Sequence, residues 1–184
     1  MSGYWKANKG DEMSEAGEKY VPKETVKDVL TYPFMDIQER GLTKETCELF
    51  GIRTALSPTD GKTHEAYYFP YYNQKGELVA YKKRDMTIPK DEKYHFTTVG
   101  NLKKDVQLFG QPLASQNQRK HSKLFVVEGE WCAASLYQSL IDDVKGTSYA
   151  DLKPFVVSIG FGTASATEHV LQNKDFVMSF KDAI

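Results

Sequence analysis

A decisive stretch of the 184-residue sequence reads Lys123-Leu124-Phe125-Val126-Val127-Glu128-Gly129-Glu130. The short apolar run within it is typical of a strand that is covered on both faces in a parallel sheet. The two glutamates follow at the carboxyl end of this strand, which is where open α/β sheets bind ligands. This stretch therefore predicts a buried strand that brings two carboxylates to a ligand site.

The sequence after this strand alternates between helical and strand patterns. Apolar residues recur at helical spacing over residues 130–141, and residues 155–159 form a second apolar run. A right-handed crossover then makes a β-α-β unit, and a further helix is expected from Thr163 to Leu171. We expect an α/β fold whose parallel sheet has begun but contains too few strands to be complete.

The sequence before it predicts a small α+β subdomain. A short helix is expected over 23–30 and a clearer one after Thr43, with Thr43 as N-cap and Gly51 as the stop. Aromatic and β-branched residues over 66–72 and 78–84 predict a β-hairpin, and 93–99 predicts another strand.

Two polar stretches divide the chain. Residues 1–22 show no period and are interpreted as a flexible tail. Residues 111–123 are rich in Gln, Ser and basic residues, and are interpreted as a boundary. The expected organisation is a tail at 1–22, an N-terminal subdomain at 23–115 and a partial α/β domain at 120–184.

Composition excludes several classes of protein. A net charge of −1 argues against a protein that coats nucleic acid through bulk charge. Cys47 and Cys132 cannot form a four-ligand zinc site, so no zinc is expected. There is no apolar run of about 20 residues and no apolar signal core, which predicts a cytoplasmic protein without a membrane partner.

The carboxylates are the first candidates for chemistry. Glu128 follows an apolar strand and must be solvated, paired or bound to a metal, because burying it alone is costly. Glu130 lies in the first helical turn, where it either assists a metal or complements the helix dipole. Gly129 between them is expected to allow a sharp turn.

Basic and aromatic residues upstream are the second candidates. Lys82, Lys83 and Arg84 on one hairpin strand suit phosphate contacts, or they protect a sheet edge. Lys103 and Lys104 either contact DNA or nucleotide, or form a solvated turn. Aromatic residues of the hairpin either stack on bases or pack in the core, namely Tyr67, Tyr68, Phe69, Tyr71 and Tyr72. His95 has no acid-rich surroundings and is not expected to bind metal.

The combination resembles a known family. Residues 124–130 and 156–166 are similar in sequence and spacing to the first half of the TOPRIM domain of T-seven-like phage primase-helicases. The resemblance continues upstream through 40–52, 71–84 and 96–110. It covers roughly residues 30–184.

This resemblance implies a DNA primase, a magnesium-dependent nucleotidyltransferase that makes short RNA primers on single-stranded DNA. The family's catalytic glutamate falls on Glu128, as general base or metal-linked acid, and Glu130 would assist the metal shell. Lys82 and Arg84 match phosphate-handling positions. Lys103 and Lys104 are further candidates for nucleotide binding, and Lys83 and Tyr71 for binding single-stranded DNA. The implied partners are ribonucleotides, a single-stranded DNA template and a hexameric replicative helicase, fused or separate, in the host cytoplasm.

The sequence departs from the family in three respects. It has no N-terminal zinc module, Cys132 stands where the family usually has an aspartate, and the Asp-x-Asp motif of the next TOPRIM strand is missing. We therefore expect the front segment of a primase, inactive alone, which a second chain could complete. The alternatives are a non-catalytic remnant that binds single-stranded DNA or a replisome partner, and a TOPRIM nuclease.

Overall fold

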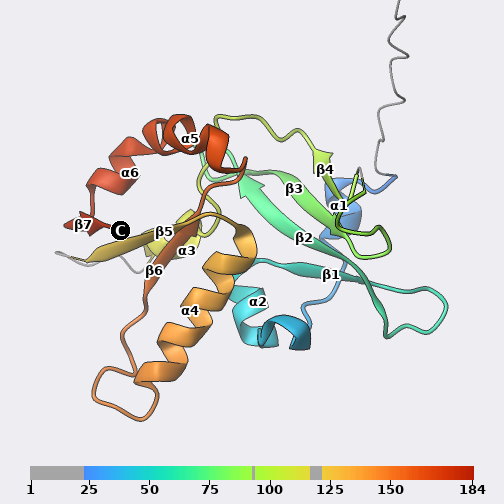
Figure 1. Cartoon of the computed structure of the whole chain (residues 1–184), viewed down its shortest axis with the longest axis horizontal. Helices are drawn as coiled ribbons and strands as arrows, with labels where there is room; N and C mark the ends of the chain where they lie inside the picture. The colour runs from blue at the N-terminus through green and yellow to red at the C-terminus, as the bar shows by residue number, and fades with distance from the viewer. Residues whose placement is uncertain (1–22, 93, 117–121) are drawn as a thin grey trace, which may run out of the picture.

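An antiparallel sheet forms the first half of the molecule. The computed structural model describes residues 23–92, 94–116 and 122–184, so the expected tail lies outside the described residues. The strand order is β1-β2-β3-β4 (Figure 1). β2 and β3 form the expected hairpin, whereas β1 was not anticipated. The strands are β1 (Arg53–Leu56), β2 (His64–Tyr72), β3 (Leu78–Asp85) and β4 (Phe96–Gly100).

The register of this sheet decides which cations share a face. Phe69 pairs with Lys82, and Tyr67 pairs with Arg84. Because side chains alternate along a strand, Lys82 and Arg84 lie on one face and Lys83 lies on the other. We call the face of Tyr67, Phe69, Lys82 and Arg84 the front face.

Short helices begin where the sequence provides caps. Thr25 and Asp28 form a capping box for α1 (Val26–Val29). The Thr43 side chain accepts a hydrogen bond from the Thr46 amide at the start of α2 (Lys44–Phe50). Gly51 ends α2 with φ 72°, and a short 3-10 helix, η1, spans Gln38–Arg40.

A parallel sheet forms the second half. Along the chain, β5 (Lys123–Val127) is followed by α4 (Glu130–Val144) and then by β6 (Phe155–Ser158). β5 pairs with β6 in parallel. The two-residue strand β7 (Asp182–Ala183) also pairs in parallel with β5, which gives the order β6-β5-β7. The predicted β-α-β unit and the α/β fold class are confirmed.

The remaining helices refine the expected pattern. The helix predicted after Thr163 is divided into η2 (Thr163–Ser165) and α5 (Ala166–Gln172), and α6 (Lys174–Met178) follows it. The stretch interpreted as a boundary begins with helix α3 (Gln111–Gln116). The buried side chain of Ala114 in α3 belongs to a small core around Leu124, Phe155 and Val157. Residues 117–121 lie outside the described residues.

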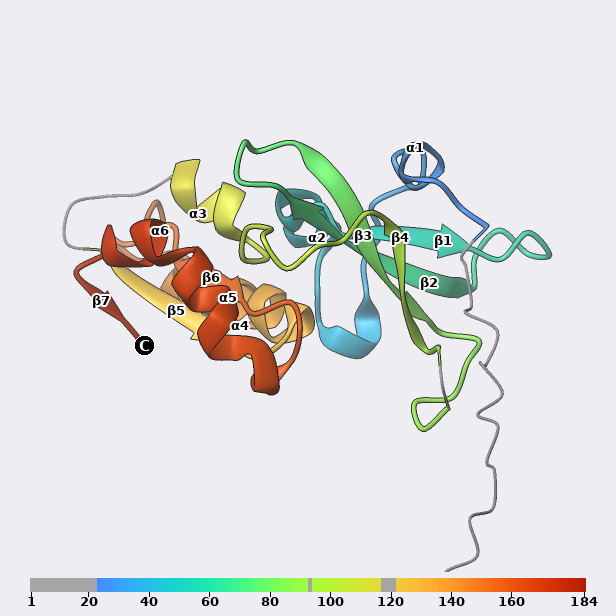
Figure 2. The same ribbon diagram turned by 90° about the horizontal axis from the view of Figure 1, so that it is seen from above.

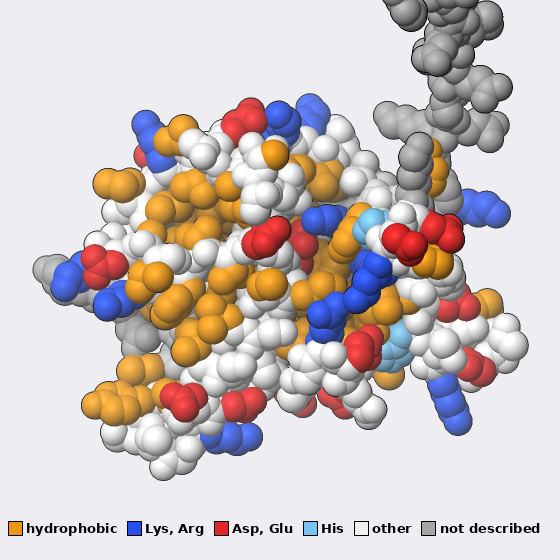
Figure 3. Space-filling model, in the orientation of Figure 1, with side chains coloured by type: hydrophobic (Ala, Val, Ile, Leu, Met, Phe, Trp, Pro, Cys, Tyr) orange, Lys and Arg blue, Asp and Glu red, His pale blue; other side chains and the backbone are white. Residues whose placement is uncertain are grey.

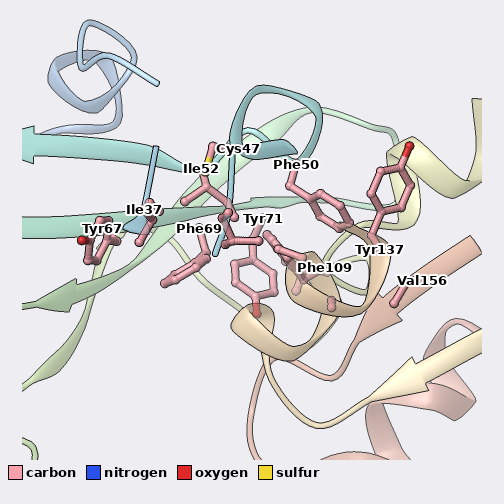
Figure 4. Close-up of a cluster of buried hydrophobic side chains, with 14 residues drawn as sticks. Ile37, Cys47, Phe50, Ile52, Tyr67, Phe69, Tyr71, Phe109, Tyr137 and Val156 are labelled. Atoms are coloured by element: carbon pink, nitrogen blue, oxygen red, sulfur yellow. The ribbon is translucent and has the colours of Figure 1, made fainter. Parts of the chain in front are cut away.

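A common core joins the two sheets. In Figure 2 the antiparallel sheet occupies one end of the molecule and the parallel sheet the other. Between them, Phe69 and Tyr71 of β2 pack in one cluster with Phe109, with Tyr137 of α4 and with Val156 of β6 (Figure 4). Burying large apolar side chains contributes about 1.5–3 kcal/mol each. The relative placement of the two sheets is therefore set by packing.

The chain after β4 is tied to the parallel sheet through its backbone. The backbone of Phe109 exchanges two hydrogen bonds with Ser158, at 3.1 and 3.0 Å, and so links the chain after β4 to β6.

Over 23–92, 94–116 and 122–184, we find no helix with both the length and the apolar character that a membrane crossing requires.

Candidate functional site

Glu128 lies where the sequence placed it, immediately after the last residue of β5. Its side chain is exposed, so the carboxylate does not bear the cost of burial. Gly129 is the N-cap of α4 with φ −134°, an extended conformation that any residue can adopt. A Cβ at this position would meet no atom within 4 Å. The sharp turn expected to require this glycine is therefore not present.

Glu130 has a different environment from Glu128. It is the first residue of α4, and only 4% of it is exposed. Its carboxylate accepts a hydrogen bond from the Tyr71 hydroxyl at 2.5 Å. It also accepts hydrogen bonds from Lys82 Nζ, at 3.0 Å to Oε1 and 3.3 Å to Oε2. Glu130 is therefore an ion-pair partner inside the protein, and its role in a metal shell stays a prediction.

This network joins three segments that are distant in the sequence. Lys82 Nζ donates a further hydrogen bond to the carbonyl oxygen of Gly160, at 3.2 Å. Gly160 packs so closely that an added Cβ would lie 2.5 Å from the Tyr71 hydroxyl oxygen. Burial and the neighbouring Glu130 carboxylate together raise the pKa of Tyr71 well above its usual value. The hydroxyl therefore stays protonated as a donor.

Lys82 remains partly accessible although it is paired. Its side chain retains 22% exposure, and Nζ lies 4.9 Å from the centre of the Phe96 ring. An ammonium group has three N–H donors, and here they face Glu130 Oε1, Glu130 Oε2 and the Gly160 carbonyl oxygen. A further anion would therefore meet the charge of this ammonium group only by sharing or replacing one of these hydrogen bonds.

Lys83 lies on the opposite face of the sheet from Lys82 and Arg84, and its contact with single-stranded DNA stays a prediction. Its ammonium group is paired with Glu24 at 2.8 Å and with Asp85 at 3.3 Å, and the side chain is only 8% exposed. The Tyr68 hydroxyl also donates to Glu24, at 2.7 Å. Lys83 therefore holds the segment before α1 against the sheet.

Arg84 and Tyr71 are also more buried than their predicted roles require. Arg84 Nη1 donates to the carbonyl oxygens of Asp85 at 2.7 Å and His95 at 3.2 Å. Its guanidinium therefore supports the loop between β3 and β4, and it also lines a cavity on the front face. Tyr71 is 1% exposed, so it cannot stack on a base in this conformation. The core-packing interpretation holds for it and for Tyr67, Tyr68 and Phe69.

The other candidates lie apart from this network. Lys103 is exposed and lines a cavity with Asn73, Val79 and Asp105. Lys104 pairs with Glu168 at 3.0 Å, and both side chains are more than half exposed. His95 has Nδ1 at 2.6 Å from the carbonyl oxygen of Glu92. The exposure of the two lysines fits their interpretation as part of a solvated turn.

At the carboxyl end of β5, Glu128 is a candidate oxygen ligand for a magnesium ion. Glu128 is an exposed carboxylate, and carboxylate oxygens suit Mg²⁺. Within the described ranges, no group of three or more His, Cys, Asp or Glu side chains is arranged to hold a metal ion. Cys132, in the first turn of α4, is exposed and supplies a thiol where an oxygen would be needed.

His169 is a buried residue that the sequence reasoning missed. The Gly160 amide donates to its Nδ1 at 3.2 Å, and its Nε2 lies 3.0 Å from the carbonyl oxygen of Val106. Accepting at Nδ1 requires the proton on Nε2, so Val106 fixes the tautomer. Burial lowers the pKa of His169, which favours this neutral form. A single histidine in a predicted helix gave no signal of this role.

Both the sequence and the fold are similar to those of known proteins. No protein-family model matches the sequence. The chain is 30% identical over 151 residues, 82% of its length, to the DNA helicase/primase of Enterobacteria phage T3. The structure matches the primase fragment of the bacteriophage T7 primase-helicase with TM-score 0.59 and 27% identity over 82% of this chain. The chain is a homologue of T7-like phage helicase/primases.

Two further structures extend this result. Primase domains of the T7 protein, bound to an RNA/DNA hybrid and dTTP beside the lagging-strand DNA polymerase, match with TM-score 0.60 and 29% identity. The catalytic domain of DnaG primase bound to single-stranded DNA matches at 16% identity and TM-score 0.54, which supports the fold alone. The primase homologue spans 22% of the phage T3 protein and 52–57% of these three solved chains.

Proposed function

We propose that this chain forms part of the active site of a DNA primase that makes RNA primers on single-stranded DNA. The main supporting observation is the Lys82–Glu130 ion pair at 3.0 Å. It brings the cationic front face of the antiparallel sheet against the acidic end of β5, in a chain homologous to phage primases.

In this proposal the two glutamates have separate roles. Glu128 is exposed, and it serves either as the general base for the primer hydroxyl or as the acid that links this hydroxyl to the metal. Glu130 does not react, but holds Lys82 in place so that its ammonium group meets a nucleotide phosphate. Such preorganised charge is the main source of catalysis in phosphoryl transfer.

The proposed cofactor is Mg²⁺, which when bound would neutralise charge on the nucleotide phosphates. Glu128 would supply one of its oxygen ligands. The 184 residues contain no Asp-x-Asp sequence. We propose that further acids come from other residues, on the same or a second polypeptide, and we expect these 184 residues alone to make no primers.

The proposed partners follow from the homologous proteins. Ribonucleotides and a single-stranded DNA template are the substrates of primer synthesis, and the homologous T7 primase domains are bound to an RNA/DNA hybrid and dTTP. The phage T3 relative is a helicase as well as a primase. A ring helicase, fused or separate, is therefore the proposed partner in replication.

The proposal is tested by primer synthesis with the protein completed by an Asp-x-Asp segment taken from a homologous phage primase. The assay contains single-stranded template, ribonucleotides and magnesium. Glu128→Gln should lower primer yield by at least about a hundredfold, in line with the typical effect of an acid-base residue. Glu45→Gln, an exposed glutamate in α2, is the matched control and should leave the yield unchanged. Full activity of Glu128→Gln would reject the catalytic assignment.

A second candidate function is non-catalytic binding of single-stranded DNA. It is favoured by the thiol of Cys132 and by the commitment of Glu130 to Lys82. This alternative expects salt-dependent binding of single strands that Lys82→Ala weakens, with no primer synthesis after completion. Primer synthesis by the completed protein would exclude it.

A further inference from the structure

Gly160, the second residue after β6, is held through both of its backbone polar groups. Its amide donates a hydrogen bond to the His169 ring of α5, with 3.2 Å between the amide nitrogen and Nδ1. Its carbonyl oxygen accepts a hydrogen bond from Lys82 Nζ, also at 3.2 Å. Glycine has more backbone freedom than any other residue, so its conformation depends on such contacts. Gly160 therefore connects His169 to the lysine of the Lys82–Glu130 pair.

The other nitrogen of the His169 ring fixes its position and tautomer. Nε2 lies 3.0 Å from the carbonyl oxygen of Val106, and that oxygen also accepts a hydrogen bond from Asn173 Nδ2 at 3.1 Å. The Asn173 side chain in turn accepts a hydrogen bond from Gln74, in the turn between β2 and β3, at 3.1 Å. The histidine is only 1% exposed. His169 therefore presents an unprotonated Nδ1 to Gly160 from a well-supported position.

The Gly160 carbonyl oxygen limits where the Lys82 ammonium group can lie. A lysine carries a compact charge on a flexible stem, so a single carboxylate does not fix its direction. Here the Glu130 carboxylate holds the ammonium group from one side and the Gly160 carbonyl oxygen adds a second anchor. Lys82 keeps 22% exposure, and Figure 3 shows basic and acidic side chains together in the middle of the molecule, with hydrophobic side chains on either side. The direction in which this charge faces the surface therefore depends on Gly160 as well as on Glu130.

We infer that His169 is a positioning residue, which holds Gly160 and, through it, keeps Lys82 in its place beside Glu130. The inference rests on the proposed primase function, in which Lys82 meets a nucleotide phosphate, and it adds a residue that acts on Lys82 from outside that contact. A proton on Nδ1 turns the acceptor into a donor that faces the Gly160 N–H, so the contact breaks when the ring becomes charged. The position of Lys82 thus depends on the protonation state of a buried histidine.

The surroundings of His169 favour its neutral form. Burial lowers its pKa below 6.5, and this outweighs the hydrogen bonds to backbone carbonyls and the charge of Glu168, which act to raise it. The neutral ring therefore contributes its full stabilisation above about pH 6.5, and this is lost as the pH falls through the lowered folded-state pKa. The charged and titratable side chains near the ring and Gly160 are Glu168 of α5, Lys104 and Asp105 after β4, Lys82 of β3, Glu130 of α4 and Tyr71 of β2.

Nuclear magnetic resonance of the 184-residue chain tests the positioning without an assay of activity. With isotope-labelled histidine, Nδ1 of His169 should show the signal of an unprotonated nitrogen at about pH 8. As the pH falls to about 5, the Gly160 amide signal and the Lys82 ammonium signal should move with the same midpoint as the His169 ring. His64→Asn is the matched control, because the His64 ring contacts the Tyr67 hydroxyl, and it should leave this midpoint unchanged. A proton on Nδ1 at about pH 8, or a Lys82 signal that does not follow His169, would overturn the inference.

Two variants separate positioning from packing. His169→Leu keeps a side chain in the core but has no acceptor, whereas His169→Asn keeps an acceptor near the place of Nδ1 and cannot be protonated in this range. In the protein completed for primer synthesis, His169→Leu should lower kcat/KM about two- to tenfold, the usual effect of losing one hydrogen bond. His169→Asn should restore most of this loss, and the step that follows His169 in the pH profile of the wild type should be absent from it.

The outcomes distinguish this inference from the proposed function. Equal losses in the two variants, with the pH step retained in His169→Asn, would show that His169 serves packing alone and would overturn the inference. If the completed wild type makes no primers while the Lys82 signal follows His169, the primase proposal is rejected and the positioning role stands. Circular dichroism checks that each variant is folded. If His169→Leu does not fold, the wild-type titration and His169→Asn still decide.

Discussion

At the scale of single residues, the Lys82–Glu130 pair has the widest structural consequences. Lys82 belongs to β3 and Glu130 to α4, and their contact is reinforced by the Tyr71 hydroxyl and the Gly160 carbonyl oxygen. Removing one partner of a largely buried pair leaves the other charge without compensation. The pair should therefore behave as a unit when it is mutated.

The first prediction is a double-mutant cycle on this pair. Glu130→Gln and Lys82→Met should each lower the free energy of unfolding by about 1–3 kcal/mol, below the cost for fully buried pairs because Lys82 is 22% exposed. The double variant should lose at least about 1 kcal/mol less free energy of unfolding than the sum of the losses in the two single variants. Urea denaturation followed by circular dichroism measures all four proteins. Additive effects would show that the pair contributes no coupling.

The alternation of side chains along a strand is enough to separate the three cations of β3. Lys82 and Arg84 share a face because they are two residues apart, and Lys83 must lie opposite. The sequence therefore contained the information that Lys83 is not part of a common phosphate surface. By contrast, the pairing of Glu130 with Lys82 spans 48 residues and depends on how two sheets pack, which local patterns do not encode.

At the scale of elements, strongly periodic segments were predictable and marginal ones were not. The hairpin, the strand before Glu128 and the helix after it follow clear periods, and the structure places them within a few residues of the expected bounds. β1 has only four residues at a sheet edge, and α3 has only six residues, with Pro112 near its start. Their conformation depends on neighbours, because β1 pairs with β2 and Ala114 of α3 is buried.

The loop after β6 supports the second prediction. An added Cβ at Gly160 would lie 2.5 Å from the Tyr71 hydroxyl oxygen, in a buried site. Gly160→Ala should therefore lower stability by about 1–3 kcal/mol through overpacking. Gly129→Ala is the matched control, since its Cβ meets no atom within 4 Å, and it should cost at most about 1 kcal/mol. The stabilities of both variants are measured by thermal or urea unfolding. If Gly160→Ala is as stable as Gly129→Ala, the steric explanation is wrong.

The segment before α1 supports a third prediction, on pH. Burial acts to raise the pKa of Glu24, but hydrogen bonds from Lys83 and Tyr68 outweigh it and lower this pKa below 4.5. Burial likewise acts to raise the pKa of Asp85, but hydrogen bonds from Thr87 and the charge of Lys83 outweigh it, and this pKa falls below 3.8. A lowered folded-state pKa adds stability above the unfolded-state value, and this stability is lost as the pH falls through the folded-state value.

Lys83→Met should therefore flatten the acid dependence of stability. The wild type should lose more stability than the variant between about pH 5 and pH 3, because its carboxylates titrate against Lys83. Lys75→Met, at an exposed turn position, is the control and should follow the wild type. Urea midpoints measured across this range provide the comparison. If stability falls equally with pH in the wild type and in Lys83→Met, the pairing of Lys83 with Glu24 and Asp85 does not cause the acid dependence.

At the scale of the whole molecule, the two sheets should unfold together. The largest core cluster takes side chains from α2, β2, α4 and β6, so neither sheet buries its apolar face alone. Phe109 lies at the centre of this arrangement, with Phe50 stacked at 5.4 Å and Phe69 edge to face at 5.9 Å. The backbone of Phe109 is hydrogen-bonded to the backbone of Ser158 in β6.

The last prediction follows from this shared core. Phe109→Ala should lower the free energy of unfolding by about 3–5 kcal/mol, because a buried aromatic ring is replaced by a cavity. Unfolding should remain a single transition, with coincident curves for Trp131 fluorescence in the Trp5→Phe background and for far-ultraviolet circular dichroism. Leu171→Ala, at a position 62% exposed on α5, is the control and should change stability by less than about 0.5 kcal/mol. Two separate transitions in the Phe109 variant would mean that the sheets are independent units, and the Lys82–Glu130 pair would then join two domains across a weak interface.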